Sequence, residues 1–558
     1  MGFAELLDHV GSMGRFQIVH VVLLSLPIFM MASHMILQNF TAGTPGHHCL
    51  VHHRNGTSGN QSLEAEGLLK VYIPMDEKGQ PEQCRRFILH QGQLSNATVA
   101  NWTEMDTETC KDGWVYDKTV FPSTIVTEWD LVCSARALKQ MAQSLYMAGV
   151  LVGGIVYGGL SDRFGRRLIL IWSCLQLAVT GTASAFSPTF SAYCTLRFLT
   201  GMAYSGTVLN IFSLCVEWTP TRIRPLLSTY NGLAYTIGQM VLAGLAYLIP
   251  EWRWLQLAVS LPYFLFFIYS WWFSESARWL VLVGKQEQAV KELKRAARMN
   301  GKHEAADKLN VELLRSNMKE EMASLKSSYT IVDLVRTPTM RRISCCLCFV
   351  WFSTSFAYYG LVMDLQHFGT NIYLIQLVFG AVDFPAKFIS VLTISYIGRR
   401  FTQAATLVLA GLTILANIFV PQDMPTTRAA LAAFGKGCLA AAFNCIYLYT
   451  GELYPTVLRQ TGMGLGNTLS RLGGISAPLV KIFSEYLPYL PHLIYGAAPV
   501  VSGVAAIFLP ETRNASLPET IEQVENRSQG QKDPKQQQQQ QMEALLDATK
   551  PETTKDAV

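Results

Sequence analysis

Two cationic side chains, Lys387 and Arg471, stand inside long apolar stretches of the sequence. A charged side chain at the centre of a bilayer costs roughly 2.5–3.5 kcal/mol on insertion scales, so its presence there needs a reason. Asp383 precedes Lys387 by one helical turn and could neutralise it. The sequence places no acidic residue within a turn of Arg471, whose guanidinium could hold a carboxylate or a sulfate by paired hydrogen bonds. We therefore expect Arg471 to bind an anion, and interhelical salt bridges are the alternative role for both cations.

Aromatic and amide side chains in the same apolar stretches are candidates for the uncharged part of a binding site. Rings supply apolar area around a bulky acid, and a few polar groups fix its orientation. These candidates are Asn39, Tyr235, Tyr358, Tyr359, Phe443 and Asn444. Packing between helices is the alternative for each ring, and the adjacent Tyr358 and Tyr359 cannot both face one cavity squarely. Of the remaining cations in apolar runs, Arg197 is interpreted as structural, and Lys436 as structural or as lining a substrate path.

The composition indicates that these residues are positioned by helices in a membrane. Half of the 558 residues are hydrophobic and only 15% are charged, whereas a soluble domain carries about 25% charged residues. The net charge of +5 is too small and too dispersed to indicate nucleic-acid binding. A soluble globule would have to bury about a dozen apolar runs at once, so membrane spans are the better explanation.

The apolar runs predict twelve spans in two groups of six, which makes the fold class an all-α membrane protein. The first run, Phe16–Phe40, is long and has no clear cleavage pattern, so we interpret it as a helix and not as a signal peptide. The remaining expected spans are 138–160, 168–186, 192–216, 226–248, 254–274, 343–363, 371–394, 402–420, 427–449, 460–482 and 489–510.

Basic residues between the spans predict which side of the membrane each loop occupies. With the N-terminus in the cytoplasm, the inward short loops hold eight arginines, and the outward short loops hold essentially only Arg253. The inward arginines are Arg163, Arg166, Arg167, Arg222, Arg224, Arg399, Arg400 and Arg459. Both termini and the central charged stretch are therefore expected inside.

The long polar segment 41–137 is expected to lie outside the cell. It contains four acceptor patterns for N-glycosylation, which occurs only on the lumenal side of a membrane. The acceptor residues are Asn55, Asn60, Asn96 and Asn101, and the segment's cysteines are Cys49, Cys84, Cys110 and Cys133. Four cysteines in an oxidising compartment predict two disulfides, with three possible pairings. A metal site is the alternative, but the close Cys-x-x-Cys spacing is missing.

Four regions follow from these patterns. We expect a first six-helix bundle over 1–274 that includes segment 41–137, a cytoplasmic central loop over 275–341, a second six-helix bundle over 342–510, and a disordered cytoplasmic tail over 511–558. The central loop alternates charged and apolar residues, which predicts short amphipathic helices. Nowhere does the sequence show metal-ligand spacing, a nucleophile motif or a phosphate-binding glycine loop, so we expect neither an enzyme nor a cofactor.

The short loop between the second and third spans carries a motif that could close a cytoplasmic gate. Its glycines allow two helices to approach closely, and its acid can pair with a base or a helix N-terminus. The motif residues are Gly158, Asp162, Arg163, Gly165, Arg166 and Arg167. A partial copy, Gly398-Arg399-Arg400, follows the eighth span, as a duplicated two-half carrier predicts. The loop resembles the signature of the major facilitator superfamily.

Further motifs narrow the resemblance. They are Asp112-Gly113-Trp114, Ser123–Cys133, Glu275-Ser-Ala-Arg-Trp-Leu280, Glu452-Leu-Tyr-Pro-Thr456 and Leu509-Pro-Glu-Thr512. Together they resemble the motifs of the organic-ion solute carrier family, and the residues within them are similar to those of its organic anion transporter branch. The resemblance runs from the first residues to about position 525.

The resemblance implies an activity and a site. It implies alternating-access uptake of amphipathic aromatic anions at the plasma membrane of an epithelial cell, in exchange for an intracellular dicarboxylate such as 2-oxoglutarate. It also implies that Lys387 and Arg471 are the anion-binding pair and that the aromatic and amide candidates line the cavity, surrounded by membrane lipid. Two alternatives remain: a carrier of organic cations or zwitterions with the same fold, and a receptor or scaffold that transports nothing.

Overall fold

The computed structural model describes residues 3–51, 69, 72–76, 79–88, 106–220, 223–316, 330–369, 371–515, 517–518 and 520–528. The chain forms two compact units. Unit 1 contains residues 1–320, 362–381 and 478–488, and unit 2 contains the rest. The short segments 362–381 and 478–488 thus contact unit 1, although the sequence places them among the later spans. The division into regions expected above remains a prediction.

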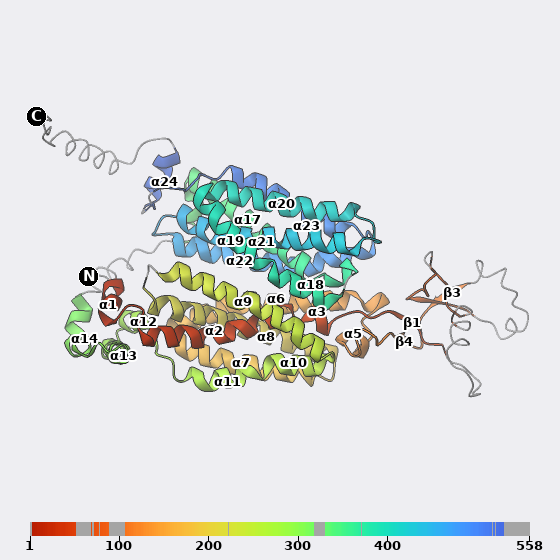
Figure 1. Ribbon diagram of the computed structural model, residues 1–558, viewed down its shortest axis with the longest axis horizontal. Helices are drawn as coiled ribbons and strands as arrows, with labels where there is room; N and C mark the ends of the chain where they lie inside the picture. The colour runs from red at the N-terminus through yellow and green to blue at the C-terminus, as the bar shows by residue number, and fades with distance from the viewer. Residues whose placement is uncertain are drawn as a thin grey trace, which may run out of the picture. The chain divides into compact units, whose positions relative to one another are not determined.

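Unit 1 is built from long helices that lie side by side, with short elements at both ends (Figure 1). The long helices are α2 (Arg15–Ile36), α6 (Ala137–Phe164), α7 (Arg166–Ala185), α8 (Phe190–Trp218) and α9 (Arg224–Leu248), followed by α10 (Trp252–Ser260) and α11 (Pro262–Ser270). The helix α8 packs against both α6 and α7, and α2 packs against α9. The break between α10 and α11 falls at Leu261, because Pro262 has no amide hydrogen to continue the first helix.

Glycines let α6 and α8 pack with their backbones in contact. A Cβ atom on Gly149 would lie 2.1 Å from the carbonyl oxygen of Phe198, and one on Gly201 would lie 2.2 Å from that of Tyr146. No side chain fits at such distances, so only glycine permits this approach. The helices α6 and α7 expose large apolar side chains such as Ile155 and Trp172, as expected of helices surrounded by lipid.

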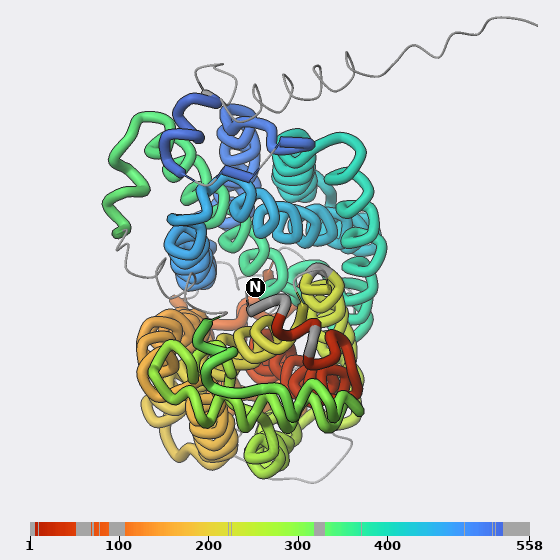
Figure 2. The backbone as a smooth tube through the Cα atoms, turned by 90° about the vertical axis from the view of Figure 1, so that its left-hand side faces the viewer, coloured from red at the N-terminus to blue at the C-terminus, as the bar shows by residue number. Residues whose placement is uncertain are grey.

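Short helices cover one end of unit 1, and small sheets lie at the other (Figure 1). The first end carries α1 (Phe3–Val10), α12 (Ala277–Leu282), α13 (Gln286–Met299) and α14 (His303–Lys308), and Figure 2 looks onto this end. Here Asn300 accepts a hydrogen bond from the Phe16 amide at 2.9 Å and so ties the end of α13 to the start of α2. The second end carries α3 (Gln38–Thr41), α5 (Ile125–Glu128), η2 (Cys133–Ala135), η4 (Leu365–Phe368), α18 (Ile372–Ala381) and η5 (Ile482–Glu485).

Two disulfides crosslink the segments that form the sheet end of unit 1. Strand β1 (His47–Cys49) pairs antiparallel with β4 (Trp114–Tyr116), and β2 (Arg85–Phe87) pairs with β3 (Thr107–Thr109). Cys49 bonds to Cys110, and Cys84 bonds to Cys133. The prediction of two disulfides is therefore confirmed. The acceptor residues Asn55, Asn60, Asn96 and Asn101 lie outside the described residues.

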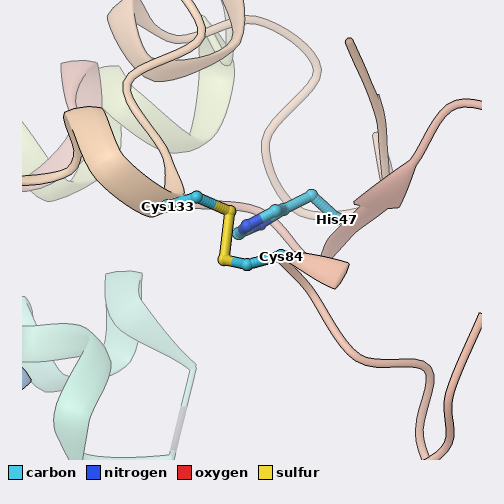
Figure 3. Close-up of side chains that lie close together, drawn as sticks. All are labelled: His47, Cys84 and Cys133. Carbon is cyan, nitrogen blue, oxygen red and sulfur yellow. A yellow bond between two sulfur atoms is a disulfide. The ribbon is translucent and has the colours of Figure 1, made fainter. Parts of the chain in front are cut away.

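A group of ligand-type atoms at this end does not form a metal site. His47, Cys84 and Cys133 lie close together, but the two sulfur atoms are bonded to each other (Figure 3). A disulfide sulfur is not a thiolate, which is the form of cysteine that binds metals. The metal alternative for these cysteines is therefore not supported.

Unit 2 consists of long helices that lie side by side (Figure 1). They are α17 (Pro338–Val362), α19 (Asp383–Tyr396), α20 (Arg399–Phe419), α21 (Pro425–Leu453), α22 (Arg459–Lys481) and α23 (Leu490–Ile507), with the short α16 (Asp333–Arg336) and α24 (Ile521–Ser528). The helix α20 packs on α21 and α23, and α19 packs on α21. The ends of α17 and α22 contribute Val362 and residues 478–481 to unit 1.

The described helices are consistent with the twelve expected spans. By length and apolarity alone, nine helical segments among the described residues could cross a membrane. The other three expected spans correspond to α9, to α10 with α11, and to α22. Helix α22 is rich in glycine and polar residues, which lowers its mean hydropathy. Within the expected tail, residues 521–528 form α24, and Glu525 accepts hydrogen bonds from Thr339 at 3.0 and 2.6 Å. The expectation of a disordered tail stays a prediction.

Candidate functional site

The centre of the candidate site in unit 2 is a buried ion pair. Lys436 Nζ on α21 lies 2.6 Å from Asp383 Oδ1 on α19, and the two side chains are 0% and 4% exposed. Asp383 stands at the start of α19, where the negative carboxylate also faces the positive end of the helix dipole. Pro385 causes the interruption before α19, because it removes the hydrogen bond to the carbonyl of Ala381. The structural interpretation of Lys436 fits this contact.

Lys387 lies one turn beyond Asp383 on the same helix and is partly buried. It interacts electrostatically with both Asp383 and Lys436. Sequence spacing indicated Asp383 as the partner of Lys387, and the structure adds Lys436 as the residue hydrogen-bonded to that carboxylate. The Asp383 carboxylate thus interacts with two ammonium groups, those of Lys436 and Lys387.

Aromatic rings border the cluster on the side of α17 and α21. The Tyr358 and Phe443 rings lie 5.4 Å apart in an edge-to-face arrangement, and Tyr358 contacts Tyr359 in the same manner. Lys436 Nζ lies 5.8 Å from the centre of the Tyr358 ring, within the range of a cation–π contact. Tyr358 is buried whereas Tyr359 is partly exposed, so the two neighbours do not face the same surroundings.

Asn444 and Arg471 extend the cluster along α21 and α22. Asn444 is exposed and donates a hydrogen bond to Ser390 Oγ at 2.7 Å, and that hydroxyl donates to the Lys387 carbonyl at 2.8 Å. Arg471 is partly buried and interacts electrostatically with Tyr447, one turn beyond Phe443 on α21. The structure thus places Arg471 within electrostatic range of Tyr447, and its closeness to Phe443 and Asn444 stays a prediction.

Tyr447 is a candidate that the sequence reasoning missed. Its hydroxyl donates to Asn467 Oδ1 at 3.1 Å, and its ring packs on Trp351 with centres 4.6 Å apart. The sequence could have indicated Tyr447 as a candidate, because it lies four residues after Phe443 and residues four apart share a helix face.

Two expected site residues, Asn39 and Tyr235, belong to unit 1 and are described within it. Asn39, at 8% exposure, donates to the Val362 carbonyl at 2.9 Å, so its amide is engaged with the last residue of α17. Tyr235 lies in α9 and is partly buried. Sequence reasoning grouped both with the aromatic candidates of unit 2, and that grouping stays a prediction.

The expected gate motif lies between α6 and α7, and Glu275 anchors it. The Glu275 carboxylate accepts hydrogen bonds from the Arg166 and Arg167 amides at 3.0 and 3.1 Å and so caps α7. Burial raises the pKa of the Glu275 carboxyl, and its amide hydrogen bonds act in the opposite direction. Gly165 before the helix has φ +104, and a Cβ there would lie 2.4 Å from the carboxylate.

The other motif side chains form a small network on the same end. Arg166 Nη1 contacts Asp162 Oδ1 at 2.6 Å, and the Trp279 indole donates to the Asp162 carbonyl at 2.8 Å. Arg163 lies over the Phe164 ring, at 5.4 Å from its centre. Gly158 has open space around its Cβ position, so it forms no close helix contact there.

Unit 2 repeats this arrangement around the partial copy of the motif. Gly398 has φ +127, and Glu511 accepts hydrogen bonds from the Arg399 and Arg400 amides at 2.9 and 3.0 Å. Arg399 Nη2 also contacts Glu452 at 2.9 Å. The same carboxylate cap at the start of α7 and of α20 is what a duplicated two-half protein predicts.

Comparisons with known proteins identify relatives and a fold. Residues 91–524 match the family described as "Sugar (and other) transporter". The chain is 57% identical over 529 residues to solute carrier family 22 member 6-A of Xenopus laevis, covering 94% of each chain, and 53% identical over 536 residues to organic anion transporter 3 of Homo sapiens, covering 96% of each.

The solved structures that resemble the chain include the inward-open xylose transporter XylE from E. coli. This likeness has a TM-score of 0.55 at 17% identity and covers 69% of this chain and 88% of that chain. A second XylE structure, a member of the major facilitator superfamily, matches with a TM-score of 0.53. At these identities the likeness shows the fold alone, and it confirms the fold class expected from the sequence.

Proposed function

The chain belongs to the sugar (and other) transporter family and, within it, to solute carrier family 22, and from this premise we propose that it carries organic anions across the plasma membrane. The family makes it a membrane transporter and not an enzyme. The observation that carries the choice of anions is the charge of the unit 2 cluster. Lys387 and Lys436 both interact with Asp383, and Arg471 interacts electrostatically with Tyr447, which lies on the same helix as Lys436. Cationic side chains in the apolar part of one helical unit favour an anion over an organic cation.

The substrates are amphipathic anions with an aromatic part. Tyr358, Tyr359 and Phe443 supply ring faces and edges beside the cations, and Asn444 supplies an amide. Rings give stacking area, while a fixed cation orients the carboxylate or sulfate. Asn39 and Tyr235 are further proposed substrate contacts, and membrane lipid surrounds the protein. Transport proceeds by alternating access, in which the site opens to each side of the membrane in turn.

The exchange of the substrate for an intracellular dicarboxylate such as 2-oxoglutarate supplies the driving force. Moving one charge through 100 mV costs about 2.3 kcal/mol, so an inside-negative membrane opposes uptake of an anion. An outgoing dianion offsets that cost. Both termini lie in the cytoplasm and segment 41–137 lies outside, in agreement with the arginines of the short loops.

Uptake of benzoate into cells or vesicles that contain the chain tests the proposal. Preloading with 2-oxoglutarate should accelerate uptake, and the absence of acceleration would refute the exchange. Uptake of a quaternary ammonium ion in place of benzoate would favour a carrier of organic cations. If neither probe moves, the chain acts as a receptor or scaffold.

Arg471 is tested by the pair Arg471→Asp and Arg471→Lys, with surface labelling to confirm equal amounts in the membrane. The acid reverses the charge and should abolish benzoate uptake, whereas the lysine keeps a point charge and should retain part of it. Transport by Arg471→Asp at the unaltered rate would remove this residue from the site.

A further inference from the structure

A pocket of about 420 Å³ lies at the end of unit 1 that carries the short helices, which is the end that faces the viewer in Figure 2. Its wall is formed by the end of α6, the start of α7, the residue that follows α11, and the helices α12 and α13. Three basic side chains line it, those of Arg167, Lys285 and Lys291. All of its lining residues belong to unit 1, so it shares none with the cluster of unit 2.

The three basic side chains of the pocket have no acidic partner. Arg167 donates through Nη2 to the Trp271 carbonyl, and Lys285 Nζ lies 5.7 Å from the centre of the Trp279 ring. Among the described residues, no carboxylate forms an ion pair with Arg167, Lys285 or Lys291. The Arg167 Nε atom is buried and has no hydrogen-bond partner among them. A buried donor of this kind calls for an acceptor, which a bound anionic group would supply.

Two acids also line the pocket, and both are engaged elsewhere. The Glu275 carboxylate accepts hydrogen bonds from backbone amides at the start of α7 and before α12. The Glu292 carboxylate lies 3.8 Å from the Arg295 guanidinium on its own helix. Even when both acids are counted as unengaged, three bases face two acids in the wall, so the pocket favours a group with negative charge.

Exposed apolar side chains continue from the pocket along two neighbouring helices. Leu168 and Trp271 line the pocket and are exposed. On α7 the exposed Trp172 and Val179 follow Leu168 at helical spacing, and near the end of α11 the exposed Ile268 precedes Trp271 by three residues. The helices α7 and α11 pack against each other and lie side by side in Figure 1. An apolar strip on each helix thus begins at the basic pocket and runs into the membrane-spanning part of unit 1.

We propose that this pocket binds the headgroup of an acidic phospholipid, phosphatidylserine. Its phosphate contacts Arg167, Lys285 and Lys291, and its acyl chains follow the apolar strips of α7 and α11. Tryptophans such as Trp172 and Trp271 are typical of the boundary between lipid and water. Acidic phospholipids are concentrated in the cytoplasmic leaflet. The site therefore rests on the proposed orientation, which places this end in the cytoplasm, and not on the nature of the substrate.

Titration of the detergent-purified full-length protein with phosphatidylserine tests the lipid site. A ligand that binds the folded protein raises its melting temperature, and the dependence of this rise on lipid concentration gives the affinity. The double variant Lys285→Gln/Lys291→Gln removes two cations that line the pocket and leaves Arg167 in place. Its affinity for phosphatidylserine should fall about 25-fold, which is about fivefold for each basic residue at an acidic lipid surface.

The control is Lys302→Gln/Lys308→Gln, which alters the net charge equally at exposed side chains of the same end that do not line the pocket. It should bind phosphatidylserine as the unaltered protein does. An equal loss of affinity in both double variants, or no loss in the pocket variant, would overturn the site. Phosphatidylcholine has no net charge, and glycerophosphoserine is the headgroup without acyl chains. A rise in melting temperature with either compound equal to that with phosphatidylserine would also overturn it.

Photo-crosslinking locates the bound lipid without any variant. Phosphatidylserine with a diazirine in one acyl chain should label peptides from α7 and α11 in vesicles that contain the full chain. An excess of unlabelled phosphatidylserine should reduce this labelling, whereas phosphatidylcholine should not. Labelling spread evenly over the helices of both units would overturn the proposal. Failure of the proposed function is a separate result, because absence of benzoate uptake by the unaltered protein changes none of these binding measurements.

Discussion

Breaking the Lys436–Asp383 pair should destabilise the protein far more than removing a surface charge. The substitution Lys436→Met leaves the Asp383 carboxylate buried at 4% exposure without the ammonium that lies 2.6 Å away. An uncompensated buried charge costs about 3–5 kcal/mol, which is a large part of the roughly 5–15 kcal/mol that keeps a domain folded. With about 2–4 °C per kcal/mol for a unit of this size, the melting temperature should fall by about 6–20 °C.

The double variant Lys436→Met/Asp383→Leu distinguishes a buried charge from lost packing. Replacing both partners by apolar side chains of similar volume is often neutral or stabilising, so most of the lost stability should return. The control Lys387→Met removes a partly buried cation from the same cluster and should cost less. The assay is thermal unfolding of the detergent-solubilised protein, followed by size-exclusion chromatography after heating. A decrease in melting temperature of less than about 2 °C for Lys436→Met would refute the reasoning. So would a double variant whose loss of stability equals the sum of the losses of the two single variants.

Two further predictions concern packing and capping in unit 1. Gly201→Ala brings a methyl group to 2.2 Å from the Tyr146 carbonyl and should prevent surface expression, whereas Gly244→Ala, with no atom within 4 Å, should be expressed normally in a surface-biotinylation assay. Glu275→Gln weakens the cap of α7 and should lower the stability by about 0.5–2 kcal/mol, measured as a lower melting temperature. Glu251→Gln is its control, because Glu251 precedes α10 without a side-chain cap; equal shifts for both would contradict the role of Glu275.

Features that repeat along the sequence could be predicted well. Apolar runs located the long helices, because a helix in lipid must present apolar side chains around most of its surface. The glycine and arginine motif predicted the start of α7 and its copy before α20. The resemblance to the organic anion transporter branch agrees with relatives at 53–57% identity.

Contacts between distant segments could not be predicted in the same way. Spacing along a helix suggested that Lys387 is the ion-pair partner of Asp383. The residue that is hydrogen-bonded to Asp383 is Lys436, which lies 53 residues away on another helix. Pairing of Cys49 with Cys110 depends on how strands β1 to β4 fold, which no local pattern encodes.

The order of the two disulfides along the chain has a consequence for proteolysis. Cys49–Cys110 and Cys84–Cys133 interleave, since each bond encloses one cysteine of the other. A single cut anywhere between residues 49 and 133 therefore leaves both fragments covalently joined, and a cut between Cys84 and Cys110 leaves them joined twice. A protease can nick this segment without releasing it, and the fragments separate on a gel only after reduction.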